Sequence, residues 1–139
     1  MHARANDIVR EARSLVGTRY GHQGRGAELD CAGLVIVAGR AAGVTDFDTL
    51  DYSRLPRPRE MKAAMMRAGC MIVPYAERAH GDILVMRTGN SPIHLGVLDV
   101  DGGVEWVIHA TNEPSRKIVD RDRLDTLDGR VLYAWRFPE

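Results

Sequence analysis

The hydrophobic pattern changes character halfway along the chain. In the first half, apolar positions recur at helical spacing between capping polar residues and terminal glycines. This pattern predicts helices at residues 6–16, 31–42 and 58–68. From Met71 onward the apolar residues form short, β-rich runs separated by Gly, Asn, Pro and Asp. These runs predict strands at 71–73, 82–87, 92–100, 104–110, 116–119 and 130–137.

Helices followed by strands are typical of an α+β domain, and we expect an antiparallel sheet packed against the second helix. A chain of 139 residues can bury one core but is too short for two domains, so a single domain spanning 1–139 is expected. Residues 17–27 contain four glycines and predict a loop that brings Tyr20 and His22 towards the start of the second helix. The irregular stretch 44–57 predicts a surface excursion.

The second helix carries the first candidate for chemistry. Asp30 is a good N-cap residue and Gly43 a good helix stop, so Cys31 should lie in the first helical turn. Unpaired backbone N–H groups and the positive end of the helix dipole favour a thiolate there. A small buried hydrophobe is the alternative, because free cysteine is among the most buried residue types. Cys70 follows the third helix, and we expect it to serve packing.

A predicted hairpin supplies a possible base. Asp101-Gly102 stands between two apolar runs, which is a strong hairpin signal. If these two residues form the turn, His94 lies directly opposite His109, with Cβ atoms ~4.5–5.5 Å apart. A turn centred on Gly102 and Gly103 shifts the register and still keeps both histidines on one face. Each histidine alone is more often structural, but two on one face of one hairpin indicate a common role.

A cysteine with two neighbouring histidines matches a nucleophile, a base and a group that orients the base. Cys31 would attack, and His94 would take its proton and later protonate the leaving amine. His109 would hold the ring and tautomer of His94.

The composition limits the classes of partner that we expect for this chain. The chain has 19 basic and 19 acidic residues, so no net positive field is available for nucleic acid. Two cysteines are too few for a disulfide scaffold. The N-terminus lacks the apolar core of a signal peptide, and no stretch approaches the length needed to span a membrane. We therefore expect no nucleic-acid or membrane partner, no cofactor, and synthesis as a soluble chain.

Together, several sequence blocks resemble the NlpC/P60 family of cell-wall cysteine peptidases. They follow the family's order over residues 8–112, and their resemblance is greatest to the compact versions encoded with phage tail genes. The blocks are Gly17-Thr-Arg-Tyr-Gly-His-Gln-Gly, Asp30-Cys31-Ala-Gly-Leu-Val, Gly81-Asp82-Ile-Leu-Val, His94-Leu-Gly-Val and Val107-Ile-His109-Ala.

The resemblance implies a papain-like core and cleavage of peptidoglycan stem peptides, commonly between D-γ-glutamate and the following diamino acid. It assigns the nucleophile to Cys31, the base to His94 and the third catalytic residue to His109. It also implies that Tyr20 and Asp30, with His22 beside them, line the substrate end of the site. The residue after the cysteine is often a substrate-contacting serine in this family, whereas this chain has alanine there.

Three other interpretations of these residues remain open. Cys31, His94 and His109 could form a zinc site with an open fourth position. The chain could be an amidase of the related CHAP type, which cuts between the lactyl group and the first alanine. It could also be a structural phage tail-tip module that keeps the fold without hydrolysis. For a peptidase, the expected place of action is the bacterial cell wall or periplasm, reached through a phage tail or another delivery apparatus.

Overall fold

The computed structural model describes residues 2–54, 57–88, 91–127 and 129–139. Within the predicted excursion at 44–57, residues 55–56 lie outside this described part, and the remainder runs without regular secondary structure. No helix in the described ranges is long and apolar enough to cross a bilayer.

The three predicted helices are all present. They are α1 (Ala5–Ser14), α2 (Cys31–Ala41) and α3 (Pro58–Arg67). Asp30 caps α2 as expected, because its side chain accepts a hydrogen bond from the Gly33 N–H. Between α1 and α2, the loop forms a two-residue parallel pair, β1 (Arg19–Tyr20) with β2 (Glu28–Leu29).

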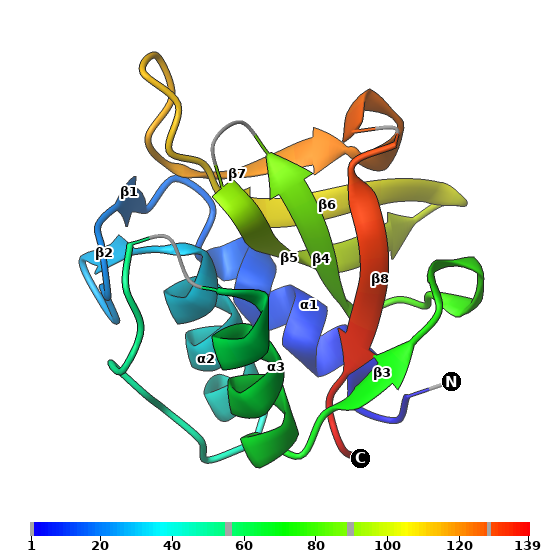
Figure 1. The fold of residues 1–139 in the computed structure, drawn as a ribbon. Coiled ribbons are helices and arrows are strands. Elements are labelled where there is room, and N and C mark those ends of the chain that lie inside the picture. Colours follow the sequence, from blue (N-terminus) through cyan, green and yellow to red (C-terminus); the bar gives the residue numbers. More distant parts are fainter. Residues whose placement is uncertain (1, 55–56, 89–90, 128) are drawn as a thin grey trace.

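Six strands form one antiparallel sheet in the order β3-β8-β4-β5-β6-β7. The strands are β3 (Met71–Val73), β4 (Ile83–Thr88), β5 (Ser91–Asp101), β6 (Val104–Ala110), β7 (Val119–Arg123) and β8 (Val131–Arg136), with short 3₁₀ turns η1 (Tyr75–Glu77) and η2 (Leu124–Leu127). The last strand in sequence, β8, therefore lies inside the sheet (Figure 1). The predicted α+β class with an antiparallel sheet is confirmed.

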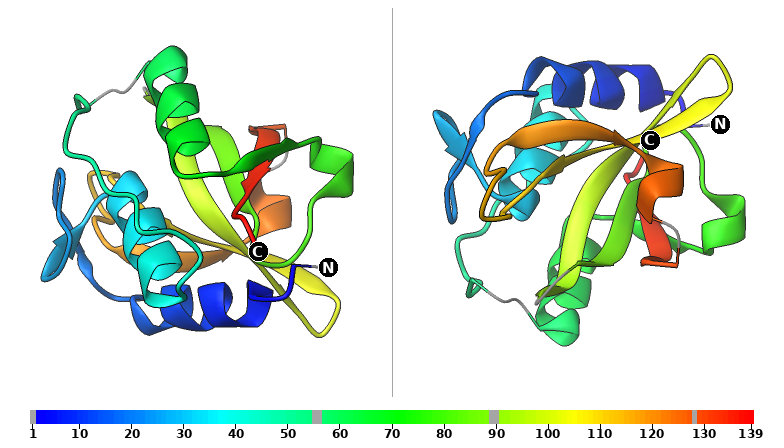
Figure 2. Two further views of the ribbon diagram at one scale, coloured as in Figure 1. Left: turned by 90° about the horizontal axis from the view of Figure 1, so that it is seen from below. Right: turned by 90° about the horizontal axis from the view of Figure 1, so that it is seen from above.

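Both faces of the sheet are covered, which explains the unbroken apolar run over residues 83–86 of β4. Ile83 and Val85 belong to a core shared with the three helices, which lie on one side of the twisted sheet (Figure 2). Leu84 and Met86 belong to a second core closed by Leu124 and other residues. Successive strand residues point to opposite faces, so an unbroken apolar run is what a doubly covered strand requires.

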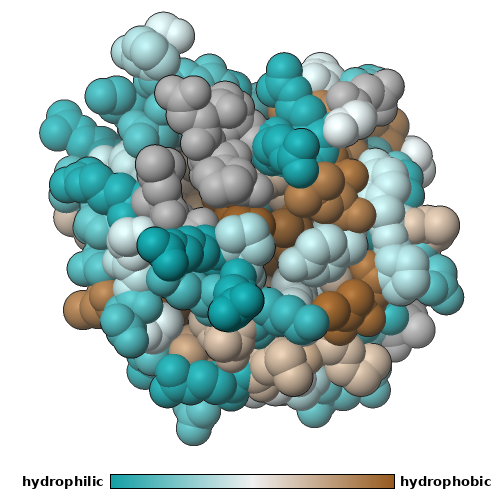
Figure 3. Space-filling view, in the orientation of Figure 1, coloured by the Kyte–Doolittle hydropathy of each residue, from teal (hydrophilic) through white to brown (hydrophobic). Residues whose placement is uncertain are grey.

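Some apolar surface remains at the outer end of the sheet. Met71 and Ile72 of β3 and Leu132 of β8 are exposed. In the orientation of Figure 1, apolar surface shows around β8 and β3, while polar side chains cover much of the remaining face (Figure 3).

The β5–β6 hairpin has the glycine-centred register. Asp101 pairs with Val104, and Gly96 pairs with His109. The register with His94 directly opposite His109 is therefore wrong, and the two histidines are diagonal neighbours on one face. Both turn residues, Gly102 and Gly103, have positive φ, at 58° and 79°. A two-residue turn of this kind needs positive φ twice, and two glycines adopt it without the strain that Asp101 would bring.

The strand expected at 116–119 is displaced towards the C-terminus, and β7 runs from Val119 to Arg123. Its residues after Val119 are charged, so the apolar pattern could not reveal it. Ionic and ring contacts fix this edge strand instead. Arg121 donates to the fully buried Asp99, and its guanidinium lies 4.2 Å from the centre of the Trp106 ring.

Candidate active site

Asp30 holds the N-terminus of α2 in place. One oxygen, Oδ1, accepts from the Gly33 N–H at 2.7 Å, and Oδ2 accepts from the Gln23 N–H at 2.7 Å. The backbone around Gly33 must approach closely, since a Cβ there would lie 2.3 Å from the Gly24 carbonyl oxygen. The carboxylate therefore ties the glycine-rich loop to the first turn of the helix.

The excursion after α2 closes over Asp30 from the other side. The Tyr52 hydroxyl donates to the carboxylate, 2.8 Å from Oδ2. Arg25 lies 3.7 Å from Oδ1 and donates to Asp48 and the Thr49 carbonyl, which fastens this segment to the loop. As a result Asp30 is only 3% exposed.

The predicted substrate residues Tyr20 and His22 lie around the same carboxylate. His22 Nδ1 is 3.7 Å from Asp30 Oδ2, and its ring packs edge-on against Tyr52. Tyr20 is half-buried against the core. Burial raises the pKa of Tyr20, and the nearby Cys31 and Asp30 raise it further. The structure thus gathers these residues at the mouth of α2.

Cys31 begins α2, partly exposed and packed against the helix-side core. Although it keeps some contact with solvent, the dense packing around its sulfur desolvates the thiolate and raises the pKa to about 11. The Leu95 N–H opposes this rise, and the negative charge of Asp30 adds to it. The expected lowering of the Cys31 pKa is therefore wrong for the free protein, because desolvation outweighs the helix terminus.

His94 and His109 form a direct hydrogen bond, with 2.8 Å between His94 Nε2 and His109 Nδ1. Both residues are buried. Burial lowers the pKa of His94 to about 3, with a further contribution from His109. Burial also lowers the pKa of His109, although the hydrogen bond to Asp122 opposes this effect. Both rings are consequently neutral at neutral pH.

Asp122 extends this pair by one more residue. His109 Nε2 lies 2.8 Å from Asp122 Oδ2, and Arg116 Nη1 donates to Asp122 Oδ1 at 2.9 Å. Partial burial raises the pKa of Asp122, but the hydrogen bonds from Arg116 and His109 outweigh it and leave the pKa below its ordinary value. The group is therefore an ionised carboxylate, which can only accept hydrogen bonds.

This carboxylate fixes both tautomers. Because Asp122 can only accept, His109 must carry its proton on Nε2 and accept at Nδ1. His94 must then donate from Nε2, which leaves its Nδ1 without a proton. No described residue hydrogen-bonds to His94 Nδ1. The ring therefore has a free basic nitrogen.

Cys31 and His94, the predicted nucleophile and base, are neighbours through the backbone. The Leu95 amide, which acts on the Cys31 sulfur, belongs to the residue after His94. Within the described ranges, no hydrogen bond joins this sulfur to the His94 ring. In unliganded enzymes such contacts are often loose and tighten when substrate binds.

The sequence interpretation missed Asp122, Tyr52 and Arg25. Asp122 lies in the charged segment that indicated no strand, and Tyr52 lies in a segment without periodicity. Only the alternation of acidic and basic residues in β7, beside a strand that carries a histidine, could have drawn attention to Asp122.

Among residues 2–54, 57–88, 91–127 and 129–139, no group of three or more His, Cys, Asp or Glu is arranged to hold a metal ion.

The fold is similar to that of solved NlpC/P60 domains. The crystal structure of the NlpC/p60 domain of peptidoglycan hydrolase SagA aligns with a TM-score of 0.62 and 17% identity, over 95% of this chain and 97% of that chain. A mutated form of the Resuscitation Promoting Factor Interacting protein RipA aligns with a TM-score of 0.61 and 17% identity, over 98% of this chain and 62% of that chain. No protein-family model and no curated protein matches the sequence. The chain has the papain-like α+β fold of these domains.

Proposed function

We propose that this protein is a cysteine peptidase that hydrolyses peptidoglycan stem peptides. The observation that carries the proposal is the hydrogen-bonded series His94–His109–Asp122, which leaves Nδ1 of the His94 ring unprotonated. The next residue, Leu95, directs its backbone N–H at the Cys31 sulfur. The similarity in fold to the SagA domain, whose description is a peptidoglycan hydrolase, supports the substrate class.

In this mechanism Cys31 and His94 begin as a neutral thiol and a neutral imidazole. His94 Nδ1 takes the thiol proton as Sγ attacks the acyl carbon. The reaction therefore uses general-base catalysis and does not need a thiolate–imidazolium pair formed in advance. Cys31 and Ala32 stand before the first intrahelical hydrogen bond, and their N–H groups lie at the sulfur. They are suited to receive the oxyanion of the tetrahedral intermediate.

The second half of the reaction reuses the same groups. His94, now protonated, gives its proton to the leaving amine, and the acyl group remains on Cys31 as a thioester. Water then attacks the thioester with His94 as base and restores the thiol. His109 orients the His94 ring throughout, and the ionised Asp122 stabilises the positive charge that forms on the two rings.

The proposed scissile bond joins D-γ-glutamate to the following diamino acid. Asp30, Tyr20 and His22 are proposed to line the substrate end. Asp30 already receives hydrogen bonds from Gly33, Gln23 and Tyr52. Because its carboxylate is so fully bound, we expect near-equal rates on a free tetrapeptide and on the same peptide attached to its disaccharide. A ten- to hundredfold preference for the free peptide that disappears in Asp30→Asn would contradict this expectation.

The test is to incubate purified protein with muropeptides and to identify the products by mass spectrometry. Cleavage after D-glutamate, absent in Cys31→Ala and His94→Ala, is the expected result. Release of intact stem peptide from the lactyl group would instead indicate a CHAP-type amidase. No cleavage by a folded protein would favour a structural module, and activity lost to a chelator would favour a zinc site.

A peptidase of this kind would act at the bacterial cell wall or periplasm. Phage tail proteins or another delivery apparatus are the proposed partners. Co-purification of the tagged chain with assembled tails would test this part of the proposal, and its absence from them would count against it.

A further inference from the structure

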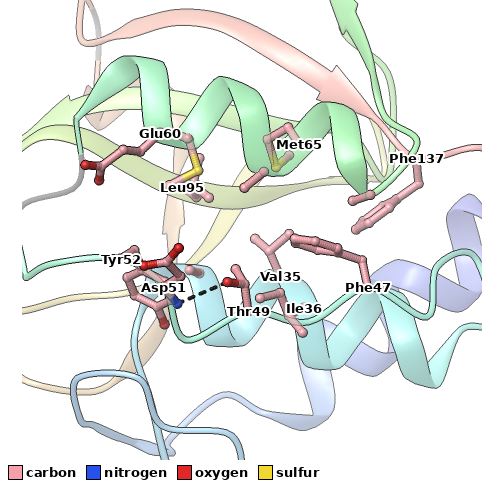
Figure 4. Close-up of a pocket in the computed structure, with 14 residues that line it drawn as sticks. Val35, Ile36, Phe47, Thr49, Asp51, Tyr52, Glu60, Met65, Leu95 and Phe137 are labelled. Atoms are coloured by element: carbon pink, nitrogen blue, oxygen red, sulfur yellow. Dashed lines mark hydrogen bonds between the residues drawn. The ribbon is translucent and has the colours of Figure 1, made fainter.

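An apolar cavity opens beside the proposed nucleophile and base. It lies between α2 and α3 and is closed by the segment around residues 47–52 (Figure 4). Ala32, which follows Cys31, and Leu95, which follows His94, both belong to its wall. The cavity is therefore within one residue of each proposed catalytic group, although neither Cys31 nor His94 lines it.

The two ends of the cavity differ in chemistry. Figure 4 shows Glu60, Asp51 and Tyr52 at one end and Phe47 with Phe137 at the other. Tyr52 also binds Asp30, the cap of the nucleophile helix, so the acidic end is the end nearer the proposed catalytic groups. From there the cavity extends along α2 and α3 into apolar surroundings.

Among the described residues of the wall, only Asp51 and Glu60 are charged. The Asp51 carboxylate makes no ion pair with any residue in the described part of the chain. The Glu60 carboxylate accepts from the Arg57 backbone N–H at 3.5 Å and likewise has no cationic side-chain partner among the described residues. Both residues are exposed, so the two carboxylates lie where the cavity meets solvent. An apolar cavity with two unpaired carboxylates at its opening favours an occupant that is apolar at one end and positively charged at the other.

The size of the cavity sets the size of that occupant. Its volume is about 50 Å³. One water-sized group requires roughly 10–15 Å³ in this measure, so the cavity accepts roughly three to five such groups. The methyl group of an alanine would leave most of it empty, and the four carbons of a leucine side chain would fill it. A phenylalanine side chain, with seven carbons, would fill it with part of the ring outside.

We propose that this cavity is a specificity pocket for a substrate residue that carries a leucine- to phenylalanine-sized apolar side chain and a neighbouring protonated amine. The inference rests on the proposed function in one respect only, namely that Cys31 is the reacting group. It extends the substrate class beyond stem peptides that begin with alanine, because those would not use the apolar part of the pocket.

The test uses alkylation of Cys31 and needs no peptidoglycan. Three chloroacetamides are compared, with methyl, 3-phenylpropyl or 2-amino-3-phenylpropyl on nitrogen, and each rate constant is divided by that for glutathione. Mass spectrometry of the peptide containing Cys31 gives the rates. We expect the 3-phenylpropyl reagent to exceed the methyl reagent by roughly ten- to a hundredfold. The added amine should raise the rate a further few-fold at low salt.

Matched variants locate the effect. Ala64 lines the cavity and Ala63 is exposed on the same helix. Ala64→Phe should abolish the aryl preference, and Ala63→Phe should retain it. Glu60→Gln with Asp51→Asn should abolish the amine effect, whereas Asp46→Asn, an exposed position in the neighbouring segment, should not.

Equal normalised rates for the methyl and phenylpropyl reagents on the unmodified protein would overturn the pocket, and this comparison stands even if Ala64→Phe fails to fold. An aryl preference that the amine does not increase would overturn the cationic half of the proposal. A protein that shows both effects yet cleaves no muropeptide would retain the pocket and refute the proposed peptidoglycan activity, so the two failures are distinguishable.

Discussion

Replacing Asp122 with asparagine should reverse the direction of the hydrogen bonds between the two histidines. Arg116 Nη1 donates to Asp122 Oδ1, so the amide oxygen of the new side chain would stay with Arg116. Its NH₂ group would then face His109 Nε2 and donate to it. His109 would carry its proton on Nδ1, His94 would accept at Nε2, and the proton of His94 would move to Nδ1. That nitrogen could no longer take the thiol proton.

The size of the effect follows from the energy needed to restore the productive tautomers. Turning the amide would place its NH₂ against Arg116 and remove a charge-assisted hydrogen bond worth ~1.5–3 kcal/mol. The productive form would then be a minor population, and kcat should fall by roughly ten- to 150-fold. KM should change little, because the structure places Asp122 behind His109 rather than at the mouth of α2.

The assay measures kcat and KM on muropeptides, with Asp120→Asn as the control. Asp120 also binds Arg116, at 3.1 Å, but forms no hydrogen bond to His109. Imidazole ¹⁵N chemical shifts report the tautomers directly and do not depend on turnover. Full kcat in Asp122→Asn, unchanged ¹⁵N shifts, or an equal loss in Asp120→Asn would refute the reasoning.

Three further predictions concern titration and stability. The folded pKa of His94, about 3, is below its ordinary 6.5, so the unfolded chain takes up the proton first. Urea titration should therefore show the free energy of unfolding falling on acidification, by about 0.7 kcal/mol per pH unit at pH 6.5 and by ~1.4 kcal/mol per pH unit at pH 4.5, and less steeply in His94→Gln. Iodoacetamide should modify Cys31 faster than the buried Cys70, with a rate that rises about tenfold per pH unit from pH 7 to 10; a plateau near pH 7 would contradict the raised pKa of Cys31. Asp99→Ala should lower the free energy of unfolding by about 1.5–3 kcal/mol, because Asp99 is fully buried and its loss removes charge-assisted hydrogen bonds from Arg13 and Arg121, which both reach solvent. Asp101→Ala at a largely exposed position should cost under about 1 kcal/mol, and similar losses in the two variants would contradict this reasoning.

Local signals explain why most elements could be predicted. Helix α2 is specified within its own sequence, by a cap at Asp30 and an apolar run that ends before a glycine. The β5–β6 hairpin is specified by its turn, although choosing between Asp101-Gly102 and Gly102-Gly103 required knowing which residues adopt positive φ. Strand β7 could not be found in this way, because salt bridges and ring contacts stabilise it rather than alternating apolar residues.

The residues of the candidate site, like the strands, could be predicted only where a local sequence signal exists. Cys31, His94 and His109 were proposed from one helix start and one hairpin, and the diagonal histidine pair is close to that expectation. Asp122 could not be proposed in this way, because its hydrogen bond to His109 depends on the register of β7, a strand that the hydrophobic pattern did not reveal. The pKa of Cys31 depends on how densely distant segments pack around one sulfur, and a helix-terminus argument cannot include that contribution.

The place of β8 within the sheet has a consequence for biosynthesis. Residues 131–136 hydrogen-bond to β3 on one side and to β4 on the other. A nascent chain that has emerged only to residue 130 therefore contains the thiol, both histidines and Asp122, yet the edges of β3 and β4 are still unpaired. Among the described strands of this sheet, β8 is synthesised after the other five, so β3 can join β4 through it only when synthesis has passed residue 136. A chain truncated before residue 131 would therefore contain every proposed catalytic residue but lack the strand that joins β3 to β4.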